Sequence, residues 1–319
     1  MAPQQRVLLT GATGHVGGHL FRHLSAVPSI ATHALVRSPR PLPDWAARAE
    51  VTFADISKSE VFATALQGVD TVVHLATRGY SAAVLPTATE LATEQRTATA
   101  LVQAAIRAGV SRFIFLSSIH VYGNSLIGVV DDDTPPSPTT EYGRSRQSIE
   151  HALLAATRDS ATTVVLLRLT NSFGTPAIPR PETWNLLLHD LCRQVVETST
   201  ISLRSDARLR RDVIALRDVV QVLTQVITSP SISHGVHLIA SGQSLQLGEW
   251  AAVVQRLARE TLGIDVSIDC RVNEGSPQPA YTLVPRKLRE AGVTIPDQRE
   301  AEIRDLLRFA LQEFGAGRQ

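Results

Sequence analysis

The stretch Val7-Leu-Leu-Thr-Gly11-Ala-Thr-Gly14-His15-Val16-Gly17 decides the fold. A short apolar run, typical of a buried strand, ends in three glycines spaced three residues apart, and an amphipathic segment over residues 16–26 follows. Gly11 permits a tight turn, Gly14 lets the backbone approach a pyrophosphate, and Gly17 allows a helix to pack closely on a strand. Free N–H groups at the start of that helix attract phosphate oxygens. The stretch predicts a strand, a phosphate-binding turn and a helix in succession.

The remainder of the first half repeats the same alternation of short β-branched runs and longer helical patterns. Strands are predicted over 32–36, 50–53, 71–75, 112–117 and 162–169, and helices over 91–108 and 145–156. Such alternation predicts βαβ units, and therefore an α/β fold with a Rossmann-type, doubly wound parallel sheet over residues 1–170. After residue 170 the alternation stops, and prolines mark irregular loops within 176–200. Residues 171–319 are predicted to form a smaller, mixed α/β substrate-binding lobe that is interleaved with the sheet.

Composition excludes several classes of protein. The chain has 319 residues, of which 44% are hydrophobic and 19% charged, so it is too apolar to be disordered. A net charge of +1 is too small for non-specific nucleic-acid binding. Charged, glycine or proline residues interrupt every apolar run, and the first strand begins too early for a signal peptide. Cys192 and Cys270 lack metal-ligand spacing. We expect a cytoplasmic protein with no bound metal and no nucleic-acid or membrane partner.

The end of the second predicted strand bears on the choice of dinucleotide. An acid that binds a free ribose 2′-hydroxyl usually stands there, but this strand runs into Arg37-Ser-Pro-Arg40. A guanidinium is suited to a 2′-phosphate, so NADP(H) is predicted in preference to NAD(H), unless Arg37 is simply a surface charge. Asp55 and Ile56, after the third strand, are predicted to meet the adenine, with turn capping as the alternative role of Asp55.

A second group of polar side chains follows the strand predicted over 112–117. Ser118 lies at its carboxyl end, where doubly wound folds place ligands. Tyr142 and Arg146 are four residues apart and share one face of a helix. A fixed cation lowers the pKa of a phenol and makes it a better acid–base group near neutral pH. Together these three groups suit hydride transfer at a carbinol carbon, with Tyr142 handling the proton.

With these motifs in order along nearly the whole chain, the sequence resembles the extended short-chain dehydrogenase/reductases of the nucleotide-sugar epimerase/dehydratase type. Further matching segments lie at 54–56, 73–76, 117–123, 167–174, 211–218 and 235–242. The resemblance implies that Ser118 is the catalytic hydroxyl, that Tyr142 transfers the proton and that Arg146 stands where the family has a lysine that binds the nicotinamide ribose. It also implies a homodimer formed through the helices around 91–108 and 141–158.

The resemblance also implies binding roles for a larger set of residues. The implied cofactor-binding residues are Gly11, Thr13, Gly14, His15, Val16, Gly17, Arg37, Asp55, Ile56, Leu75, Ala76, Thr77, Tyr142, Arg146 and Thr170. The implied substrate-binding residues are Arg78, Ser118, His120, Asn171, Arg211 and Arg286, of which Arg211 would grip a diphosphate. Alternatives stay open for four of these: Asn171 as a structural amide, His120 as a hydrogen-bonded structural histidine, and Arg211 and Arg286 as surface charges.

Three departures from the family pattern narrow the chemistry. Sugar 4,6-dehydratases carry an Asp-Glu pair where this chain has Ile119-His120, so a dehydratase is not expected. Glu94 replaces an asparagine of the family's proton relay, and Arg146 replaces the lysine, keeping its charge but never releasing its proton. Since 29 of the 31 basic residues are arginine, this replacement follows a bias of the whole chain.

The leading expectation is an NADPH-dependent reductase of a nucleotide-activated keto-sugar, in particular a dTDP-4-keto-6-deoxyhexose 4-ketoreductase. The first alternative is a nucleotide-sugar 4-epimerase with tightly bound NAD. A non-enzymatic, dinucleotide-sensing protein on the same fold and a reductase of a non-nucleotide ketone are the others.

Overall fold

A seven-stranded parallel sheet forms the centre of the protein. The structure is a computed structural model and describes residues 4–39, 41–77, 86–178, 181–272 and 278–315. The strand order is β11-β7-β5-β4-β1-β2-β3, and every neighbouring pair is parallel. These strands are β1 (Gln5–Thr10), β2 (Ile30–Val36), β3 (Glu50–Phe53), β4 (Thr71–His74), β5 (Arg112–Ser118), β7 (Thr163–Leu169) and β11 (Gly235–Ile239). The predicted Rossmann-type, doubly wound sheet is confirmed.

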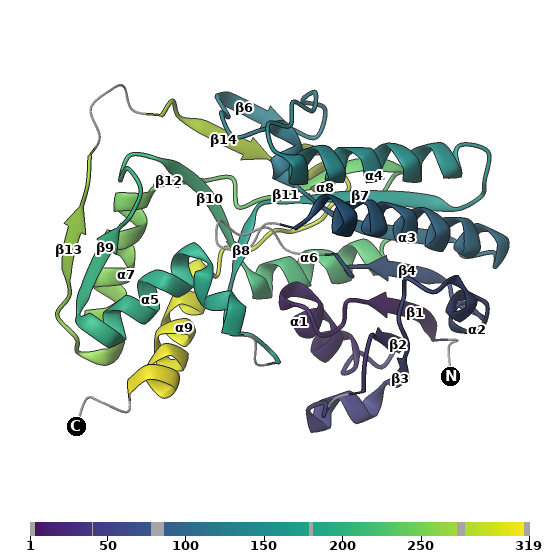
Figure 1. Cartoon of the computed structure of the whole chain (residues 1–319), viewed down its shortest axis with the longest axis horizontal. Coiled ribbons are helices and arrows are strands. Elements are labelled where there is room, and N and C mark those ends of the chain that lie inside the picture. Colours follow the sequence, from purple (N-terminus) through teal and green to yellow (C-terminus); the bar gives the residue numbers. More distant parts are fainter. Residues whose placement is uncertain (1–3, 40, 78–85, 179–180, 273–277, 316–319) are drawn as a thin grey trace.

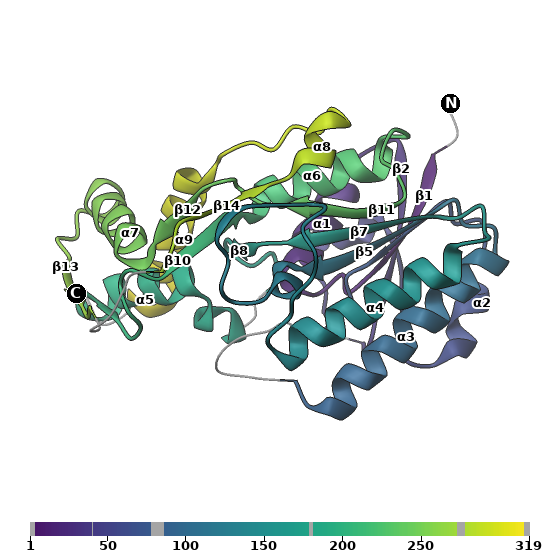
Figure 2. The same ribbon diagram turned by 90° about the horizontal axis from the view of Figure 1, so that it is seen from above.

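Helices cover both faces of this sheet (Figure 2). Helices α2 (Phe62–Ala65), α3 (Ala88–Arg107) and α4 (Glu141–Thr157) lie on one face, and α1 (His15–Leu24) and α6 (Leu216–Thr228) lie on the other. Alternate residues of one strand serve the two faces, since Val7 and Leu9 pack toward α1 and α6 while Leu8 packs toward α2 and α3. Burial on both faces explains why these strands are continuous apolar runs.

A second hydrophobic core lies in the C-terminal part of the chain. It is built largely from α5 (Leu187–Thr198), α7 (Leu247–Leu262) and α9 (Arg299–Phe314), with β9 (Thr200–Leu203) paired to β13 (Ser267–Cys270). The carboxyl ends of the central strands point toward this lobe (Figure 1). Among the helices that the structure describes, none is long and apolar enough to cross a membrane.

Short pieces of backbone connect the two cores. A three-stranded sheet holds β8 (Asn171–Phe173), β10 (Arg210–Ala215) and β12 (Ser244–Gln246), and β6 (Gly128–Asp131) pairs with β14 (Tyr281–Val284). The remaining elements are α8 (Arg286–Glu290) and the 3₁₀ turns η1 (Asp44–Arg48), η2 (Ser59–Val61), η3 (Ile119–Tyr122) and η4 (Pro181–Asn185). The chain therefore passes between the lobes several times, as β11 and α6 return to the central sheet from beyond residue 171.

The prediction of irregular loops within 176–200 is wrong for the second half of that segment, where the chain forms α5. Leu188, Leu191, Cys192, Val195 and Val196 recur at helical spacing and are all buried in the second core. The prolines at 176, 179 and 181 all precede the helix, so they leave its hydrogen bonds intact.

The turn between β1 and α1 is tightly packed. Gly11 has a φ of 74°, and a Cβ there would lie 2.5 Å from the Leu75 carbonyl carbon. A Cβ on Gly17 would overlap the Gly11 carbonyl oxygen, whereas a Cβ on Gly18 would meet nothing closer than the Ala177 Cβ at 3.6 Å. The turn depends on the absence of side chains at Gly11 and Gly17.

Replacing Gly17 with alanine is expected to lower the free energy of unfolding by about 2–4 kcal/mol, because backbone must move to admit the methyl group. Gly18→Ala is the matched control on the same helix, and it should change stability by no more than about 1 kcal/mol. Urea denaturation of both variants measures the difference. Equal stability of the two variants would contradict the packing described here.

Candidate active site

The β1–α1 turn places backbone N–H groups at the carboxyl edge of the sheet. Thr13, Gly14, His15 and Val16 form the end of the turn and the start of α1, and Gly14 is the residue that precedes the helix. No side chain caps the start of α1, and its first turn carries no acidic side chain. The arrangement fits the pyrophosphate of a dinucleotide, since side chains are excluded where backbone must come close.

Neighbouring segments enclose this turn. The backbone of Leu75 and Ala76 abuts Gly11, and the Thr77 N–H donates to the Leu75 carbonyl at 2.8 Å. The His15 ring meets the His189 ring of α5 edge-on, with centroids 5.4 Å apart. Residues predicted from two separate segments of sequence are thus brought together, and His189, which the sequence analysis did not predict, brings the C-terminal lobe to the turn.

Arg37 lies directly after β2 and is exposed. It lies close enough to Asp55 to help lower the pKa of that carboxyl, although the larger cause is the hydrogen bond from the Ser57 N–H at 3.0 Å. That bond is the turn-capping role left open for Asp55. Arg37 therefore lies near an acidic side chain, Asp55, which follows β3 and not β2.

Ser118 and Tyr142 meet at the end of β5. Ser118 is the last residue of that strand, and its hydroxyl accepts from the His120 N–H at 3.3 Å. Tyr142 lies in the first turn of α4, where the Thr140 hydroxyl caps the helix by accepting from the Gly143 N–H at 3.0 Å. A hydrogen bond joins the Ser118 and Tyr142 side chains. The two predicted catalytic groups are therefore within reach of one substrate oxygen.

Arg146 follows one turn later on α4, and its side chain is 0% exposed. Its guanidinium carbon lies 5.1 Å from the centre of the Tyr142 ring and 5.8 Å from that of Phe115. Its Nη2 group donates to the Glu94 carboxylate of α3, while Nε and Nη1 are buried with no hydrogen-bond partner among the described residues. Two buried donors without acceptors are costly and are suited to ligand hydroxyls, which fits the ribose role implied for this position.

Burial dominates the ionisation of Tyr142. It raises the pKa of the phenol, while Arg146 lowers it, Glu94 raises it again and the hydrogen bond to Ser118 lowers it. The net direction is upward. The expected effect of the cation is present, but the expectation of a lowered pKa is wrong for this chain because burial and Glu94 outweigh Arg146.

His120 lies beside Tyr142, and Arg211 lies close enough to His120 to affect its ionisation. The His120 ring meets the Tyr142 ring edge-on at 5.7 Å. Burial lowers the pKa of His120, and the nearby charge of Arg211 lowers it further. Arg211 comes from β10, so the C-terminal lobe contributes a cation to the same region. The structure places His120 beside Tyr142 and brings the charge of Arg211 close to His120, and substrate binding by either residue stays a prediction.

Two other predicted residues are engaged in holding backbone. The Thr170 hydroxyl and the Asn171 side-chain amide both donate to the Asp212 carbonyl, at 3.0 and 2.9 Å. These bonds tie β8 to β10. For Asn171 they agree with the alternative of a structural amide.

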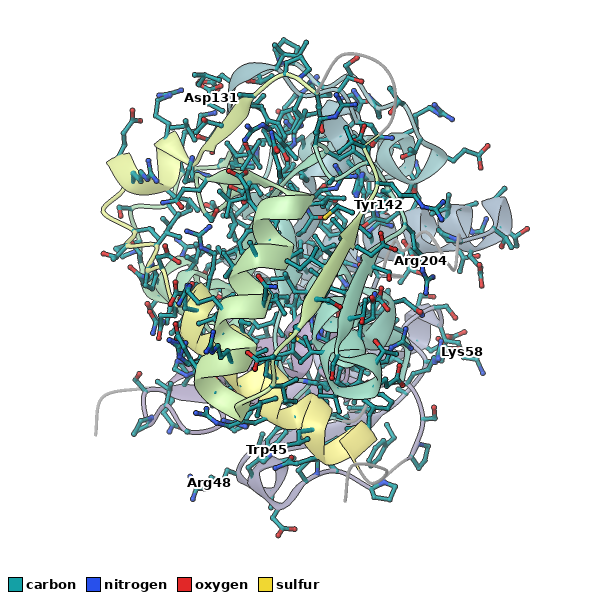
Figure 3. The ribbon with its side chains drawn as sticks, turned by 90° about the vertical axis from the view of Figure 1, so that its left-hand side faces the viewer. Trp45, Arg48, Lys58, Asp131, Tyr142 and Arg204 are labelled. Carbon is teal, nitrogen blue, oxygen red and sulfur yellow. The ribbon has the colours of Figure 1, made fainter. Side chains whose placement is uncertain are left out.

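Arg286 occupies a cluster of acids. It forms ion pairs with Asp131, Asp133 and Glu290, and it is partly exposed. Figure 3 shows Asp131 well away from Tyr142. The structure supports the alternative role of Arg286 as a surface charge. Arg78, also predicted to bind substrate, lies outside the described residues.

A buried network that sequence inspection missed holds α4 on the sheet. Arg168 of β7 donates through Nη2 to Glu150 of α4 at 2.6 Å and through Nε at 3.1 Å, and Ser117 donates to the same carboxylate at 2.5 Å. The side chains of Arg168 and Glu150 are 5% and 2% exposed.

Among the described residues no cluster of histidine, cysteine and acidic side chains is arranged to hold a metal ion.

A Rossmann-type sheet with a serine, a tyrosine and a cation at its carboxyl edge is the arrangement of short-chain dehydrogenase/reductase enzymes. The chain belongs to the NAD dependent epimerase/dehydratase family, whose model matches residues 7–239. The resemblance stated from the sequence motifs is confirmed.

The curated proteins that are similar to this chain include both epimerases and dehydratases. UDP-glucose 4-epimerase of Vibrio cholerae is 29% identical over 255 residues, which span 76% of this chain and 73% of that protein. dTDP-glucose 4,6-dehydratase of Streptomyces niveus is 24% identical over 183 residues, about half of each chain at 53% and 54%.

Solved structures share the fold over the whole length. MoeE5 in complex with UDP-glucose and NAD superposes with a TM-score of 0.77 at 24% identity, covering 97% of this chain and 99% of its own. UDP-N-acetylglucosamine 4-epimerase of Methanobrevibacter ruminantium M1, in complex with UDP-N-acetylmuramic acid, gives a TM-score of 0.82 at 17% identity, covering 98% and 99%. At these identities the likeness shows the fold.

Glu150→Ala is expected to lower the free energy of unfolding by about 3–5 kcal/mol, because it leaves the Arg168 charge buried and unpaired. Glu260→Ala is the control, since Glu260 is 43% exposed and its pairs with Arg256 and Arg304 lie at the surface. The control should cost about 1 kcal/mol or less. Urea denaturation compares the two variants, and similar losses would refute the structural role of the network.

Proposed function

We propose that this protein interconverts a hydroxyl and a ketone at one ring carbon of a nucleotide-diphosphate sugar, and that it does so as a 4-epimerase. The observation that carries the proposal is the meeting of Ser118, Tyr142 and Arg146 at the carboxyl end of β5, with the charge of Arg211 close to His120, which lies beside Tyr142. The match to UDP-glucose 4-epimerase over 76% of this chain supports the epimerase assignment.

Each side chain has a task that follows from its surroundings. Tyr142 Oη exchanges the proton of the sugar hydroxyl, and the Ser118 hydroxyl, bonded to it, orients and polarises the same oxygen. Arg146 Nε and Nη1 are the donors that would hold ribose hydroxyls of a nicotinamide dinucleotide. When bound, such a dinucleotide supplies the hydride acceptor and donor. Arg211 would hold the substrate diphosphate by charge-assisted hydrogen bonds.

The residues after Ser118 favour an epimerase over a dehydratase. Elimination of water needs an additional acid and base beside the reacting carbon, and Ile119 supplies neither. His120 is partly buried with a lowered pKa, and so is largely neutral at neutral pH. A homodimer through α3 and α4 remains part of the proposal.

Arg37 favours a second candidate, an NADP(H)-dependent 4-ketoreductase. An exposed guanidinium at the end of β2 is suited to a 2′-phosphate, and a reductase must exchange its cofactor in every turnover. The nearby Asp55 weakens this argument, because it offers a carboxylate partner to the same arginine. NAD(H) is therefore the dinucleotide of the leading proposal.

One experiment separates the candidates. The purified protein is denatured to release and identify any bound dinucleotide, and the native protein is incubated with UDP-glucose and with dTDP-glucose while NMR follows the configuration at C4. We expect bound NAD, and isomerisation at C4 with no net change in nicotinamide absorbance. Tyr142→Phe should lose the isomerisation. Stoichiometric oxidation of NADPH by a dTDP-4-keto-6-deoxyhexose, without isomerisation, would establish the reductase. A dinucleotide-bound protein inert in both assays would overturn the enzymatic proposal.

Arg211→Gln is expected to raise the KM for the nucleotide sugar about 10- to 100-fold, the loss of one charge-assisted contact, with the affinity for dinucleotide unchanged. Arg204→Gln is the control, because Arg204 is an exposed arginine of the same lobe (Figure 3). Initial rates and dinucleotide titrations measure both effects. An unchanged KM in Arg211→Gln would point to a substrate without a diphosphate.

A further inference from the structure

Two helices that pack side by side contribute one buried ion pair to the active-site region. Glu94 of α3 and Arg146 of α4 are 52 residues apart in sequence, and their side chains are 10% and 0% exposed. Among the described residues, Glu94 is the carboxylate that forms an ion pair with Arg146. The charge of Arg146 therefore depends on this one acid for its balance.

Among the residues that the structure describes, the other groups placed against the Arg146 guanidinium are uncharged. Phe115 and Tyr142 present their rings at 5.8 and 5.1 Å. His74 lies close enough to interact with Arg146, but burial, and then Arg146 itself, lower its pKa to about 3, so it is neutral at physiological pH. A buried cation without Glu94 would face only rings and a phenol, which is an unfavourable environment.

We propose that Glu94 is a positioning residue: it fixes the Arg146 guanidinium against the Tyr142 ring and, by balancing its charge, contributes to setting the pH at which the Tyr142 phenol releases its proton. The inference rests on the proposed function only in giving Tyr142 the reacting proton. The inference gives Glu94 a role in the function of the site. It is therefore more than a substitution that the fold tolerates.

The positioning follows from the shape of the guanidinium. Of the three guanidinium nitrogens, Nη2 donates to Glu94, whereas Nε and Nη1 have no hydrogen-bond partner among the described residues. A long side chain anchored at one corner has its remaining donors held in a fixed plane. Loss of the anchor frees the plane to rotate, so the affinity for a dinucleotide should fall together with the change in Tyr142.

The electrostatic effect follows from the sign of each neighbour of Tyr142. The groups that face the phenol are Arg146 on its own helix, Glu94 on α3, Ser118 on β5 and His120 on η3. Arg146 favours the phenolate, Glu94 opposes it, and neutral His120 adds no charge. Glu94→Gln removes the opposing charge while keeping the size of the side chain, so the phenol should ionise at lower pH.

The test measures ionisation directly, without turnover. Tyrosinate absorbance is titrated in the whole protein and in Tyr142→Phe, and subtraction isolates Tyr142 from the other tyrosines. With Glu94→Gln the isolated curve should move to lower pH by on the order of one unit. The basic group seen in the pH profile of kcat should move in the same direction, and NAD affinity should fall severalfold. Glu94→Asp keeps the charge and should restore most of the wild-type curve.

Glu302→Gln is the matched control, since it weakens the ion pair with Arg217 of another buried glutamate, which lies on α9 and not on α3 or α4. It should lower stability and leave the Tyr142 titration in place. If Glu94→Gln is too unstable to titrate, Glu94→Gln/Arg146→Met removes both charges; it should be more stable than Glu94→Gln and ionise at higher pH. A wild-type Tyr142 curve in Glu94→Gln, or an equal shift in Glu302→Gln, overturns the inference. A shifted curve in a protein without epimerase activity would refute the proposed function and leave the Glu94 inference standing.

Discussion

The ion pair between Glu150 and Arg168 is the interaction on which the rest of the site depends. Arg168 is fixed by its strand, β7, and Glu150 is fixed to it by a forked contact, so the face of α4 turned to the sheet is determined. Arg146 and Tyr142 lie one and two turns before Glu150 on that face. A ladder of three side chains thus runs from the buried sheet to its carboxyl edge, where Ser118 ends the neighbouring strand.

The arginine bias of the composition gains a structural reason at these positions. A guanidinium can donate along a plane to both oxygens of a carboxylate, as Arg168 does, or share its donors between a carboxylate and a ligand, as Arg146 is placed to do. An ammonium is a point charge with no such plane. The same side chain serves in the core and at the reacting edge, with a carboxylate from a facing helix in each case.

Elements that depend on local sequence patterns could be predicted from the sequence. Apolar runs and glycine spacing were sufficient to predict the central sheet and the β1–α1 turn, because a continuous apolar run of this length is typical of a strand buried on two faces. The sequence analysis did not predict α5, because the three prolines that precede it favour a loop. The helical spacing of Leu188, Leu191 and Val195 was the signal for this helix. Strands of three or four residues such as β8 and β12 form through pairing alone and leave no pattern. The Glu94–Arg146 pair was visible only as two separate departures, since nothing in sequence joins residues on different helices.

The position of β11 bears on how the protein is made. This strand closes the central sheet beside β7, yet it is the part of that sheet farthest along the chain, at Gly235–Ile239. Until it arrives from the ribosome, β7 has an unpaired edge, and until α6 is made the apolar face beside α1 is uncovered. Contacts so distant in sequence form slowly. The nascent first half is therefore exposed to aggregation until α6 and β11 have been made, and assembly of the sheet waits for both lobes.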